Sequence, residues 1–568
     1  MKKIITFALG AALAFNAAAQ TWQDALLFSE NNYSGTARGV GMGNALTAIG
    51  GDAGSLVFNP AGSATASYSQ FVITPAVTLS FANTGASADN LESFKGQAIS
   101  NTYARMKLPN VGFIMNIKTG RRSGLKNVAW GVVVNSTNNF TGRYKAAGVN
   151  ADNSYAASLA SLAQFYSKGF IEDRDSYYNK EQLDQQFYPA WSALTGYHSG
   201  MIDWVIDNER EYVAITEVME EKEGGEKEYY LAAPVDQQYG QQRYGYKTDA
   251  LLNFAMNFSD KLYIGANLGL TNLSYALSEF WYEAPNRPED FPIIRYSTGT
   301  STQFESLRMN RQYRLSGTGL FFKAGFLWRP VSGVRLGAAI QTPTLLNLRE
   351  RYGYSGQVNL KGIFASNASS PEDEFIYALT SPFRFNLGAA YTFGNRAVLS
   401  ADYEFVDYSQ ARFRSRTSNN EYGTGWFGKT NQEISQLMGI SHEIRIGMEV
   451  KLSPDVSIRG GYNLTTGAQY SFLDNDDNLV RLSSADRVLQ LKHGASLGVG
   501  YSFGGLFIDA AVRGRFVPQD KVIAYDYYYT PYPKADYSEK KVDYDVLTPE
   551  YIVNNVFVDI LLTLGWRF

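Results

Sequence analysis

The chain has 568 residues, with no cysteine and only three histidines. The absence of cysteine excludes a disulfide framework, a thiolate metal site and lipid attachment to a cysteine after an export signal. Lysine and arginine number 51 against 54 aspartates and glutamates, which gives a net charge of -3. This balance lacks the basic footprint of nucleic-acid-binding proteins, so we expect neither a nucleic-acid partner nor a cofactor.

Long apolar runs are also missing. The longest one lies at the N-terminus, between two lysines and three consecutive alanines, and is well short of the ~20 residues that a membrane-spanning helix needs. This order predicts a signal peptide over residues 1–19 and a mature chain that begins at Gln20. Any membrane span in the exported protein would therefore consist of β-strands.

Aromatic residues are abundant: 14% of the chain, with 39 tyrosines and 34 phenylalanines. The last residues, VNNVFVDILLTLGWRF, alternate so that one face of a strand is wholly apolar and the other is mixed. SHEIRIGMEVKL and GLFIDAAVRGRF show the same period of two. A soluble β-sandwich would alternate in the same way, so strand length and connections have to decide between the two.

The alternating runs are long, and tight turns such as FSDK and FGNR join them in alternation with polar stretches at 345–380, 415–438 and 518–550. This asymmetry is typical of outer-membrane barrels. We therefore predict an all-β fold, a transmembrane antiparallel barrel of about fourteen strands in the bacterial outer membrane. The predicted strands cover 70–82, 108–118, 127–142, 244–258, 261–283, 302–329, 333–349, 381–393, 397–415, 439–452, 455–472, 486–503, 505–518 and 552–568.

The last strand ends in aromatic residues. Trp566 and Phe568 suit the C-terminal signal that the barrel assembly machinery recognises, which makes that machinery an expected partner. The excess of tyrosine and phenylalanine would form girdles where the barrel meets the outer-membrane lipid.

Residues 20–69 precede the first predicted strand of the barrel domain, 70–568, and show little alternation. A lumen of about fourteen strands is too wide for its own side chains to fill. Because glycine and other small residues allow sharp reversals and close packing, we predict that 20–69 is a plug inside the barrel.

A phosphate-binding loop is the competing interpretation of this glycine-rich segment. Gly41 and Gly43 begin like a dinucleotide fingerprint, but the third glycine would fall at Leu46 and no strand precedes the segment. The motif is therefore incomplete, and a plug is the better interpretation.

Charges on the strand faces opposite the apolar residues carry both signs. Mixed signs favour a hydrogen-bonded lumen that holds a plug over an ion sieve of one sign. The predicted lumen-facing charges are Arg335, Arg384, Arg445, Arg513, Glu443 and Asp509, together with Arg459, Arg515, Glu449, Asp402, Glu404 and Asp559.

The stretch GGDAGSLVFNPAG, residues 50–62, resembles the N-terminal hatch of the FadL-type outer-membrane transporters. The segments 322–344 and 381–409 resemble hairpins of the same family, in the same order. The resemblance implies a monomeric barrel that takes up hydrophobic molecules, such as long-chain fatty acids or aromatic hydrocarbons, by passive diffusion. It also implies that the ligand shifts the hatch and leaves sideways through a kinked early strand, for which VVVNSTNNF around Asn135 is a candidate. The residues assigned to the plug and its gating are Gly41, Gly43, Asp52, Ala53, Asn59, Pro60, Ala61 and Gly62.

A long polar insertion, about residues 143–243, is predicted as the largest extracellular loop, with a possible helix over 179–207. Such a loop could capture a substrate, or it could be a plain solvated insertion. The second hypothesis for function is therefore a structural or adhesin-type barrel that presents its loops.

Catalysis and metal binding have little support. Three scattered histidines and no cysteine give no metal-ligand spacing, and His493 and Ser496 fall on opposite faces of one strand. We therefore expect no enzyme activity, and hydrophobic uptake and loop presentation remain as the two hypotheses.

Overall fold

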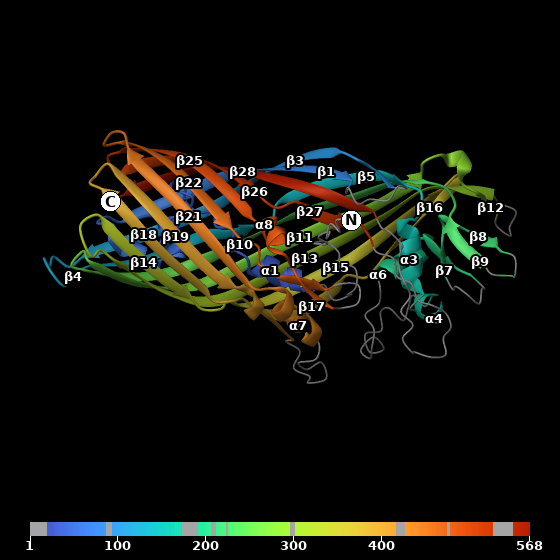
Figure 1. The fold of residues 1–568 in the computed structure, drawn as a ribbon, viewed down its shortest axis with the longest axis horizontal. Coiled ribbons are helices and arrows are strands. Elements are labelled where there is room, and N and C mark those ends of the chain that lie inside the picture. Colours follow the sequence, from blue (N-terminus) through green and yellow to red (C-terminus); the bar gives the residue numbers. More distant parts are fainter. Residues whose placement is uncertain are drawn as a thin grey trace.

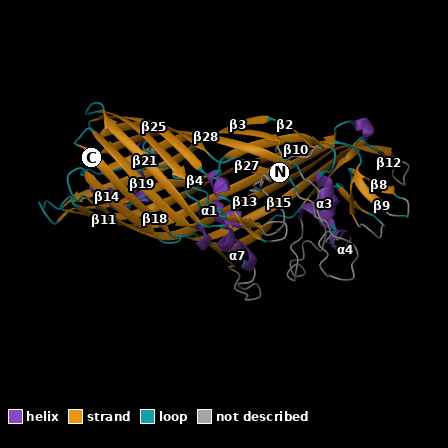
Figure 2. Ribbon diagram, in the orientation of Figure 1, coloured by secondary structure: helices purple, strands orange, loops and turns teal. Residues whose placement is uncertain are grey.

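The computed structural model describes residues 20–86, 94–164, 166, 168–172, 191–205, 212–222, 225, 227–295, 301–415, 427–473, 478–525 and 549–568 (Figure 1). The predicted signal peptide, 1–19, lies outside these residues. Strands dominate the described chain, and the helices are short (Figure 2). In the described part of the chain, no helix is long and apolar enough to cross a membrane.

Fourteen antiparallel strands form a closed barrel, as the sequence predicts. The first strand pairs with the second on one side and with the last on the other, and this second pairing closes the wall. In wall order, the strands are β1 (Gln70–Ala86), β3 (Ile99–Lys118), β4 (Leu125–Asn139), β10 (Val235–Phe258), β11 (Leu262–Pro285), β13 (Ser301–Trp328), β14 (Val334–Gln341), β18 (Arg384–Phe393), β19 (Ala397–Asp407), β21 (Ile440–Lys451), β22 (Val456–Thr465), β25 (Lys492–Phe503), β26 (Leu506–Phe516) and β28 (Glu550–Arg567).

The alternating sequence explains these strands. On β28, Leu562 and Leu564 point outward and are 42% exposed, whereas Thr563 between them is fully buried on the inner side. An apolar outer face with a polar inner face is the reverse of a soluble sandwich. The barrel therefore presents its hydrophobic surface to its surroundings and its polar side chains to its lumen.

The tight turns gather at one end of the barrel, where Figure 1 also places the C-terminus. Between β10 and β11 the chain reverses at Ser259 and Asp260, both with φ of 56°, the left-handed conformation that suits a two-residue hairpin turn. The longer connections lie at the other end, with α3 (Tyr155–Ala163) and α6 (Trp191–His198). This end is called the wide end below.

The outer apolar surface has a definite height. On β11 it runs from Ile264 to Leu270, and on the paired strand β13 from Leu320 to Trp328. Towards the wide end the outward positions become polar, beginning with Thr318 on β13. A run of this length matches the ~9–11 residues of a tilted strand that crosses a bilayer. We call this surface the apolar belt.

The strands continue well beyond the belt, so the prediction of a loop over 345–380 was wrong. The polar outward residues there, such as Asn347 and Arg349, hid an alternation whose inward members are Leu346 and Leu348. The strands beyond the belt are β2 (Phe94–Gln97), β5 (Gly142–Asn150), β12 (Ile293–Arg295), β15 (Leu345–Leu360), β16 (Ile363–Ser369), β17 (Asp373–Thr380), β20 (Arg412–Ser415) and β27 (Asp520–Ile523).

The range predicted for the largest loop, 143–243, is too wide. Strand β5 pairs with the first part of β10, from Asn150↔Val235 to Gly142↔Arg243, so both belong to the extended barrel. The described part of the predicted helix 179–207 contains α6 and the strand β6, and residues 179–190, 206 and 207 lie outside the described residues. The other elements beyond the wall are α4 (Lys168–Glu172), α7 (Gly428–Leu437), α8 (Ser484–Val488), β6 (Ile202–Trp204), β7 (Tyr212–Ala214), β8 (Glu217–Glu221), β9 (Lys227–Leu231), β23 (Ser471–Leu473) and β24 (Leu479–Arg481).

Candidate functional site

The N-terminal segment, residues 20–69, lies inside the barrel and is called the plug. Between Tyr33 and Ala64, every residue except Arg38 and Gly51 is buried. Its helical elements are α1 (Trp22–Ser29), α2 (Ala37–Gly41) and the 3-10 turns η2 (Ala53–Val57) and η3 (Pro60–Thr65). Helix α2 packs on β22, β25, β26 and β28, whereas η3 packs on β4, β10, β11 and β13. The plug thus touches distant parts of the wall and fills the lumen between them.

Asp52 holds two parts of the plug together. Its Oδ1 accepts hydrogen bonds from the Gly54 amide and the Thr36 hydroxyl, both at 2.7 Å, and it caps the start of η2. Thr36 in turn caps α2 by accepting from the Gly39 amide at 3.1 Å. A capping hydrogen bond is worth about 1 kcal/mol. Asp52 is therefore a fold determinant of the plug.

Asn59 joins the plug to the wall. Its side-chain oxygen accepts from the Ala61 amide at 3.1 Å, and its amide donates to the Thr47 carbonyl at 2.9 Å and to the Phe326 carbonyl of β13 at 2.8 Å. Pro60 follows at the first position of η3, where its missing N–H costs nothing. The Asn-Pro-Ala motif is thus a cap that also binds the barrel.

Glycines on the inner face of the wall let the plug backbone approach closely. A Cβ built on Gly461 would lie 2.0 Å from the Gly43 nitrogen, and one on Gly447 would lie 2.2 Å from the Met42 oxygen. In the plug, Gly43 has φ of 60° and faces Tyr462 of β22, where a Cβ would come within 2.8 Å of the backbone nitrogen. Further wall glycines under the plug are Gly265, Gly325, Gly337 and Gly388. The wall is therefore shaped to the backbone of the plug.

Wall side chains bind carbonyl groups that the short plug helices leave free. Lys247 of β10 donates to three carbonyls at the end of α1, those of Phe28 at 2.8 Å and of Ser29 and Glu30 at 3.2 Å. Arg335 reaches the Ile49 carbonyl at 3.1 Å. Similar hydrogen bonds come from Arg384 to Ser29, Lys323 to Val57, Arg513 to Tyr33, Asn253 to Pro60 and Asn267 to Leu56.

A first ion cluster lies behind the middle of the plug. Arg445 is fully buried, with Nη2 2.5 Å from a Glu404 oxygen and 2.6 Å from a Glu443 oxygen, and Arg384 binds the other Glu404 oxygen at 3.0 Å. The Arg445 guanidinium also lies over the ring of Phe58, 4.7 Å from its centroid. Removing one partner from such a buried network costs about 3–5 kcal/mol.

A second ion cluster includes a plug residue. Arg38 binds both oxygens of Glu449, at 2.9 and 3.1 Å. Glu449 also accepts from Arg459 at 2.6 Å, and Arg459 reaches Asp509 at 2.6 Å. In a third cluster, the Asp559 carboxylate accepts from Arg513, Arg515 and Lys107. The mixed charges predicted for the lumen therefore form ion pairs, except Arg335, which binds the Ile49 carbonyl, and Asp402, which accepts from the Thr47 amide at 2.7 Å. In the second cluster an ion pair joins the plug to the wall.

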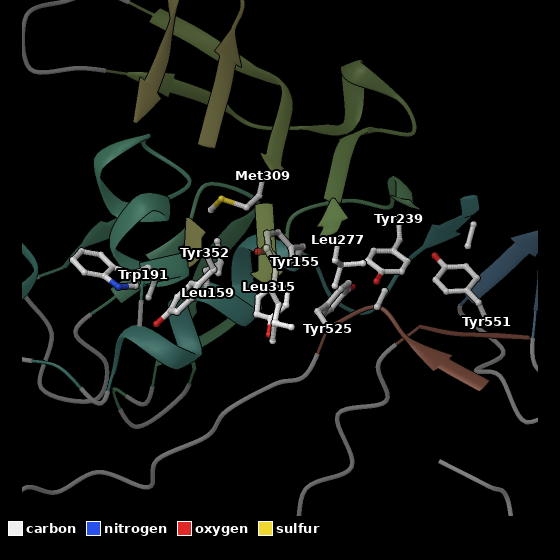
Figure 3. Packing of buried hydrophobic residues seen from close by; sticks show 14 of the residues in the cluster. Tyr155, Leu159, Trp191, Tyr239, Leu277, Met309, Leu315, Tyr352, Tyr525 and Tyr551 are labelled. Atoms are coloured by element: carbon white, nitrogen blue, oxygen red, sulfur yellow. The ribbon is translucent and has the colours of Figure 1, made fainter. Parts of the chain in front are cut away.

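Above the plug, towards the wide end, lies a large aromatic region (Figure 3). The ring centroids of Phe28 in α1 and Tyr275 lie 5.6 Å apart, and those of Tyr275 and Tyr313 lie 6.0 Å apart. Further out, Tyr155 of α3 stacks on Trp281 with centroids 5.0 Å apart. Helix α1 thus joins the plug to a packed apolar cluster that continues into the elements beyond the belt.

The backbone ladder of the wall is interrupted between β3 and its neighbour. Their pairs run from Lys118↔Asn127 to Asn110↔Asn135 and stop there. Further along, β4 pairs only with β10, and β2 pairs with β5 from Gln97↔Ala147 onward. Among the described pairings, residues 99–107 pair with β1 on one side, and the whole stretch 98–109 has no partner strand on the side of β4. We call this stretch the ladder break.

Two prolines lie at the end of the ladder break that is nearer the tight turns. Pro75 of β1 faces Leu108 and Pro109 of β3, where the register shifts and the inward and outward faces of β3 exchange. Proline has no N–H for a ladder hydrogen bond, and an extra residue bends the strand. On the outer side Met106 is 79% exposed. The predicted kink around Asn135 lies at this place, with a further register shift beside Ser136.

The plug and several side chains cover the ladder break from within. The Ser34 amide donates to the Ser136 carbonyl at 2.9 Å, and the Asn32 amide donates to the Thr137 carbonyl at 2.6 Å. The plug thus binds β4 just where β3 has left it. Side-chain contacts across the break are Thr84 Oγ1 to the Lys145 carbonyl at 2.6 Å, Asn139 Nδ2 to Thr78 Oγ1 at 3.3 Å and Arg105 over the Tyr244 ring at 5.4 Å.

Comparison with known proteins gives structural neighbours of low sequence identity. A Pseudomonas aeruginosa FadL homologue is 13% identical, with 94% of this chain and 98% of that chain covered and a TM-score of 0.47. The Pseudomonas putida toluene transporter TodX is 11% identical over 95% and 99%, with a TM-score of 0.46, and the Ralstonia pickettii toluene transporter TbuX is 11% identical over 95% and 100%, with a TM-score of 0.43. No protein-family model and no curated protein matches the chain.

The remaining predicted residues lie in the plug and at the C-terminal end of the wall. Gly41 approaches Gly498 of β25, Ala53 packs on Gly112 of β3, and Gly62 lies against Gly50 within the plug. Trp566 and Phe568 are exposed on the outside, and Phe568 pairs with Ser69 where the barrel closes. Their recognition by assembly machinery stays a prediction.

Two histidines form contacts on the outer face. Nδ1 of His442 lies 2.7 Å from the Tyr403 hydroxyl, and Nδ1 of His493 lies 2.6 Å from the Tyr462 hydroxyl. Ser441, next to His442, donates instead to the Thr466 carbonyl. Within the described ranges, no group of three or more histidine, aspartate or glutamate residues is placed to hold a metal ion.

The sequence analysis missed two parts of the site: the wall glycines, and Lys247 and Lys323. These glycines and lysines have the inward parity of their strands, so a search for inward glycines and cations opposite the plug could have found them. The ladder break depends on which strands pair, so the sequence indicated only a candidate position, the stretch around Asn135, where the β3–β4 ladder stops. The prolines Pro75 and Pro109 are a further signal of the same place.

Proposed function

We propose that this chain is an outer-membrane channel for hydrophobic molecules, such as fatty acids or aromatic hydrocarbons, and that its plug is the gate. The apolar belt supports the location, since its height suits strands that cross a bilayer. The predicted signal peptide accounts for export to that membrane.

A plugged lumen argues against an open porin. Hydrogen bonds, ion pairs and close backbone contacts hold the plug, and no disulfide fixes it to the wall because the chain lacks cysteine. The plug can therefore shift without breaking the strand ladder of the wall. Its motion would open a path from the aromatic region past Phe28 towards Ser34.

The observation that carries the proposal is the ladder break covered by the plug. At this place the wall is held by side-chain contacts, and the plug residue Ser34 occupies the free edge of Ser136 on β4. A molecule that displaces the plug here meets an opening beside the exposed residues Met106 and Leu108. We infer that hydrophobic molecules leave sideways into the membrane, which spares them a passage through water.

Uptake assays test the proposal. In cells that lack the chain, we expect expression of the wild-type protein to raise uptake of a labelled long-chain fatty acid or of toluene, and to leave uptake of a polar sugar unchanged. The purified protein should conduct few ions in a planar bilayer, and organic extraction should release an apolar molecule that mass spectrometry identifies.

Other outcomes would favour other functions. Sugar uptake together with steady ion currents would indicate a diffusion porin. Equal hydrophobic uptake with and without the chain, and no apolar molecule in the extract, would point to a barrel that presents its outer loops.

A further inference from the structure

Six arginines occupy outward positions on three strands beyond the apolar belt. Arg308 and Arg314 lie on β13, Arg349 and Arg351 on β15, and Arg412 and Arg414 on β20. All six have the outward parity of their strands, because the residues that alternate with them, such as Tyr313, Glu350 and Phe413, are buried inside. We call this surface the outer basic face.

Pairing brings these arginines together. Arg314 lies directly opposite Arg351 in the register of β13 and β15. Strand β17 pairs with β15 through Arg351↔Glu374 and with β20 through Ala378↔Arg414. The four strands β13, β15, β17 and β20 are therefore neighbours, and the arginines share one continuous patch of sheet.

The positive charge of this patch is only partly balanced by the described carboxylates near it. Glu374 is the one outward carboxylate in the described stretches 308–318, 345–353, 374–380 and 412–415, and Glu372 and Asp407 lie at the edges of the patch. Glu374 lies 2.6 Å from Arg351 and 3.7 Å from Arg349, whose side chains remain 44% and 52% exposed. Arg314 and Arg351, which carry the same charge, face each other across the strands, an arrangement that destabilises a sheet. An anion bound between them would remove this cost.

Other parts of the wall lack this feature. The outward positions of β22, β25 and β26, all of which lie in the described chain, carry neither lysine nor arginine. There the outer face is apolar or aromatic, as at Leu497, Val512 and Phe516. These three strands therefore carry no counterpart of the outer basic face.

Apolar residues border the arginines on the side of the belt. Ile376 pairs with Arg349 and is 41% exposed. Leu345 precedes Arg349 on β15, closer to the belt, and is 59% exposed. A ligand that fits this surface has phosphate groups next to acyl chains. Arginine suits phosphate because its planar guanidinium offers two parallel N–H donors.

We propose that the outer basic face binds the phosphate groups of a phosphorylated glycolipid in the outer leaflet, with acyl chains against Leu345 and Ile376. This inference rests on the proposed outer-membrane location and is independent of what the lumen carries. The bound lipid would fix the depth of the barrel in the membrane at this sector, beside the strands that surround the aromatic region.

Binding of purified lipid to the full-length mature chain in nanodiscs tests the proposal. The probes are bisphosphorylated lipid A, its dephosphorylated form and inorganic phosphate. The test variant combines R314Q, R349Q and R351Q. The control combines K118Q, R121Q and R122Q, which removes the same charge from the exposed turn end of β3. All six positions are exposed, and a heat-dependent shift on electrophoresis confirms that each barrel is folded.

We expect the test variant, which lacks three arginines, to bind lipid A more weakly by on the order of 100-fold, since each arginine near an anionic lipid surface adds roughly fivefold. The control variant should bind like the wild type, and the dephosphorylated lipid should bind weakly to all three. Equal binding of lipid A by the test variant and the wild type would overturn the proposal. Competition by inorganic phosphate at the same concentration as lipid A would overturn the lipid as the ligand.

Uptake of hydrophobic molecules separates this inference from the proposed function. The test variant should retain uptake, because none of its three arginines faces the lumen. If the wild type binds lipid A as expected but takes up no hydrophobic molecule, the proposed function fails and the lipid site stands.

Discussion

At the scale of single residues, the site depends on wall glycines, which have no side chain. Gly461 of β22 has no side chain, and the backbone of Gly43 in the plug lies in the space where a Cβ would be, 2.0 Å from the nitrogen. A backbone contact cannot yield as the end of a flexible side chain does. The fit between plug and wall is therefore sensitive to a single methyl group.

We predict that Gly461→Ala displaces the plug and leaves the barrel folded. Overpacking of this kind costs about 1–3 kcal/mol, which the plug can relieve by moving away. Ion conductance in planar bilayers should increase, and so should the sensitivity of cells to large antibiotics. The matched control is Gly460→Ala, whose new methyl group points outward and meets only Leu497, at 4.0 Å. Equal conductance of the two variants would contradict the role of the close contact.

The sequence predicted some of these residues and not others. Asp52, Asn59 and Pro60 belong to a local motif whose caps form within a few residues, so their pattern is visible in the chain itself. Gly447 and Gly461 lie more than 400 residues after Met42 and Gly43, the plug residues that they contact, and nothing local shows this contact. Contacts between distant segments require the pairing of the whole barrel.

At the scale of elements, helix α1 is held at its two ends by different chemistry. Its last carbonyls bind Lys247, and just before its start Gln20 donates to the buried carboxyl of Glu350 at 2.5 Å. Glu350 lies on β15, beyond Leu345, the last apolar outward residue of that strand. Desolvation by burial raises the pKa of Glu350 from its ordinary 4.5 to about 7. The hydroxyl groups of Tyr313 and Tyr377 also donate to it.

This pKa predicts a pH dependence for the stability of the folded barrel. In the unfolded chain Glu350 has its ordinary pKa, so the folded state binds more protons, and this part of the stability is complete below about pH 4.5 and is lost as the pH rises through about 7. The change is on the order of 3 kcal/mol. Hydrogen exchange of the peptide 345–352, corrected for its intrinsic rate, should show less protection at pH 8 than at pH 5.

Glu350→Gln is the control for this effect, because it keeps the shape and the acceptor oxygen but cannot ionise. Its protection should vary much less between pH 5 and pH 8. If the wild type and this variant respond to pH alike, another group is responsible.

Elements differ in how far the sequence predicted them. All fourteen barrel strands were predicted, because an apolar outer face gives every strand the same period of two. Strands β5, β15 and β17 were missed or shortened because they lie beyond the belt, where polar outward residues such as Arg351 break the pattern. The exchange of faces at Pro109 was also missed, since a single extra residue does not change the composition of a strand.

At the scale of the whole molecule, the barrel combines a wall of paired strands with a plug that noncovalent contacts hold in the lumen. At the ladder break the plug forms a β-bridge with the wall, between Ser34 and Ser136 of β4. The central claim is that the wall opens at the ladder break when the plug moves away from it. A reversible bond between the two residues would fix the plug where it has to move.

The native chain has no cysteine, so an engineered disulfide has no competing thiol. Partners in an antiparallel bridge have Cα atoms close to the ~4.4–6.8 Å that a disulfide needs. The test variant is therefore S34C with S136C. The control is S274C with S316C, a pair that joins β11 to β13 within the wall and does not touch the plug. Thiol labelling reports the extent of oxidation of each variant.

The deciding measurement is the uptake of a labelled hydrophobic molecule by cells with each variant, oxidised and then reduced. We predict that oxidation of S34C with S136C lowers uptake to background and that a reductant restores it, whereas the wall pair transports equally well in both states. Full uptake by the oxidised plug pair would contradict the claim that the plug moves away from the ladder break during transport.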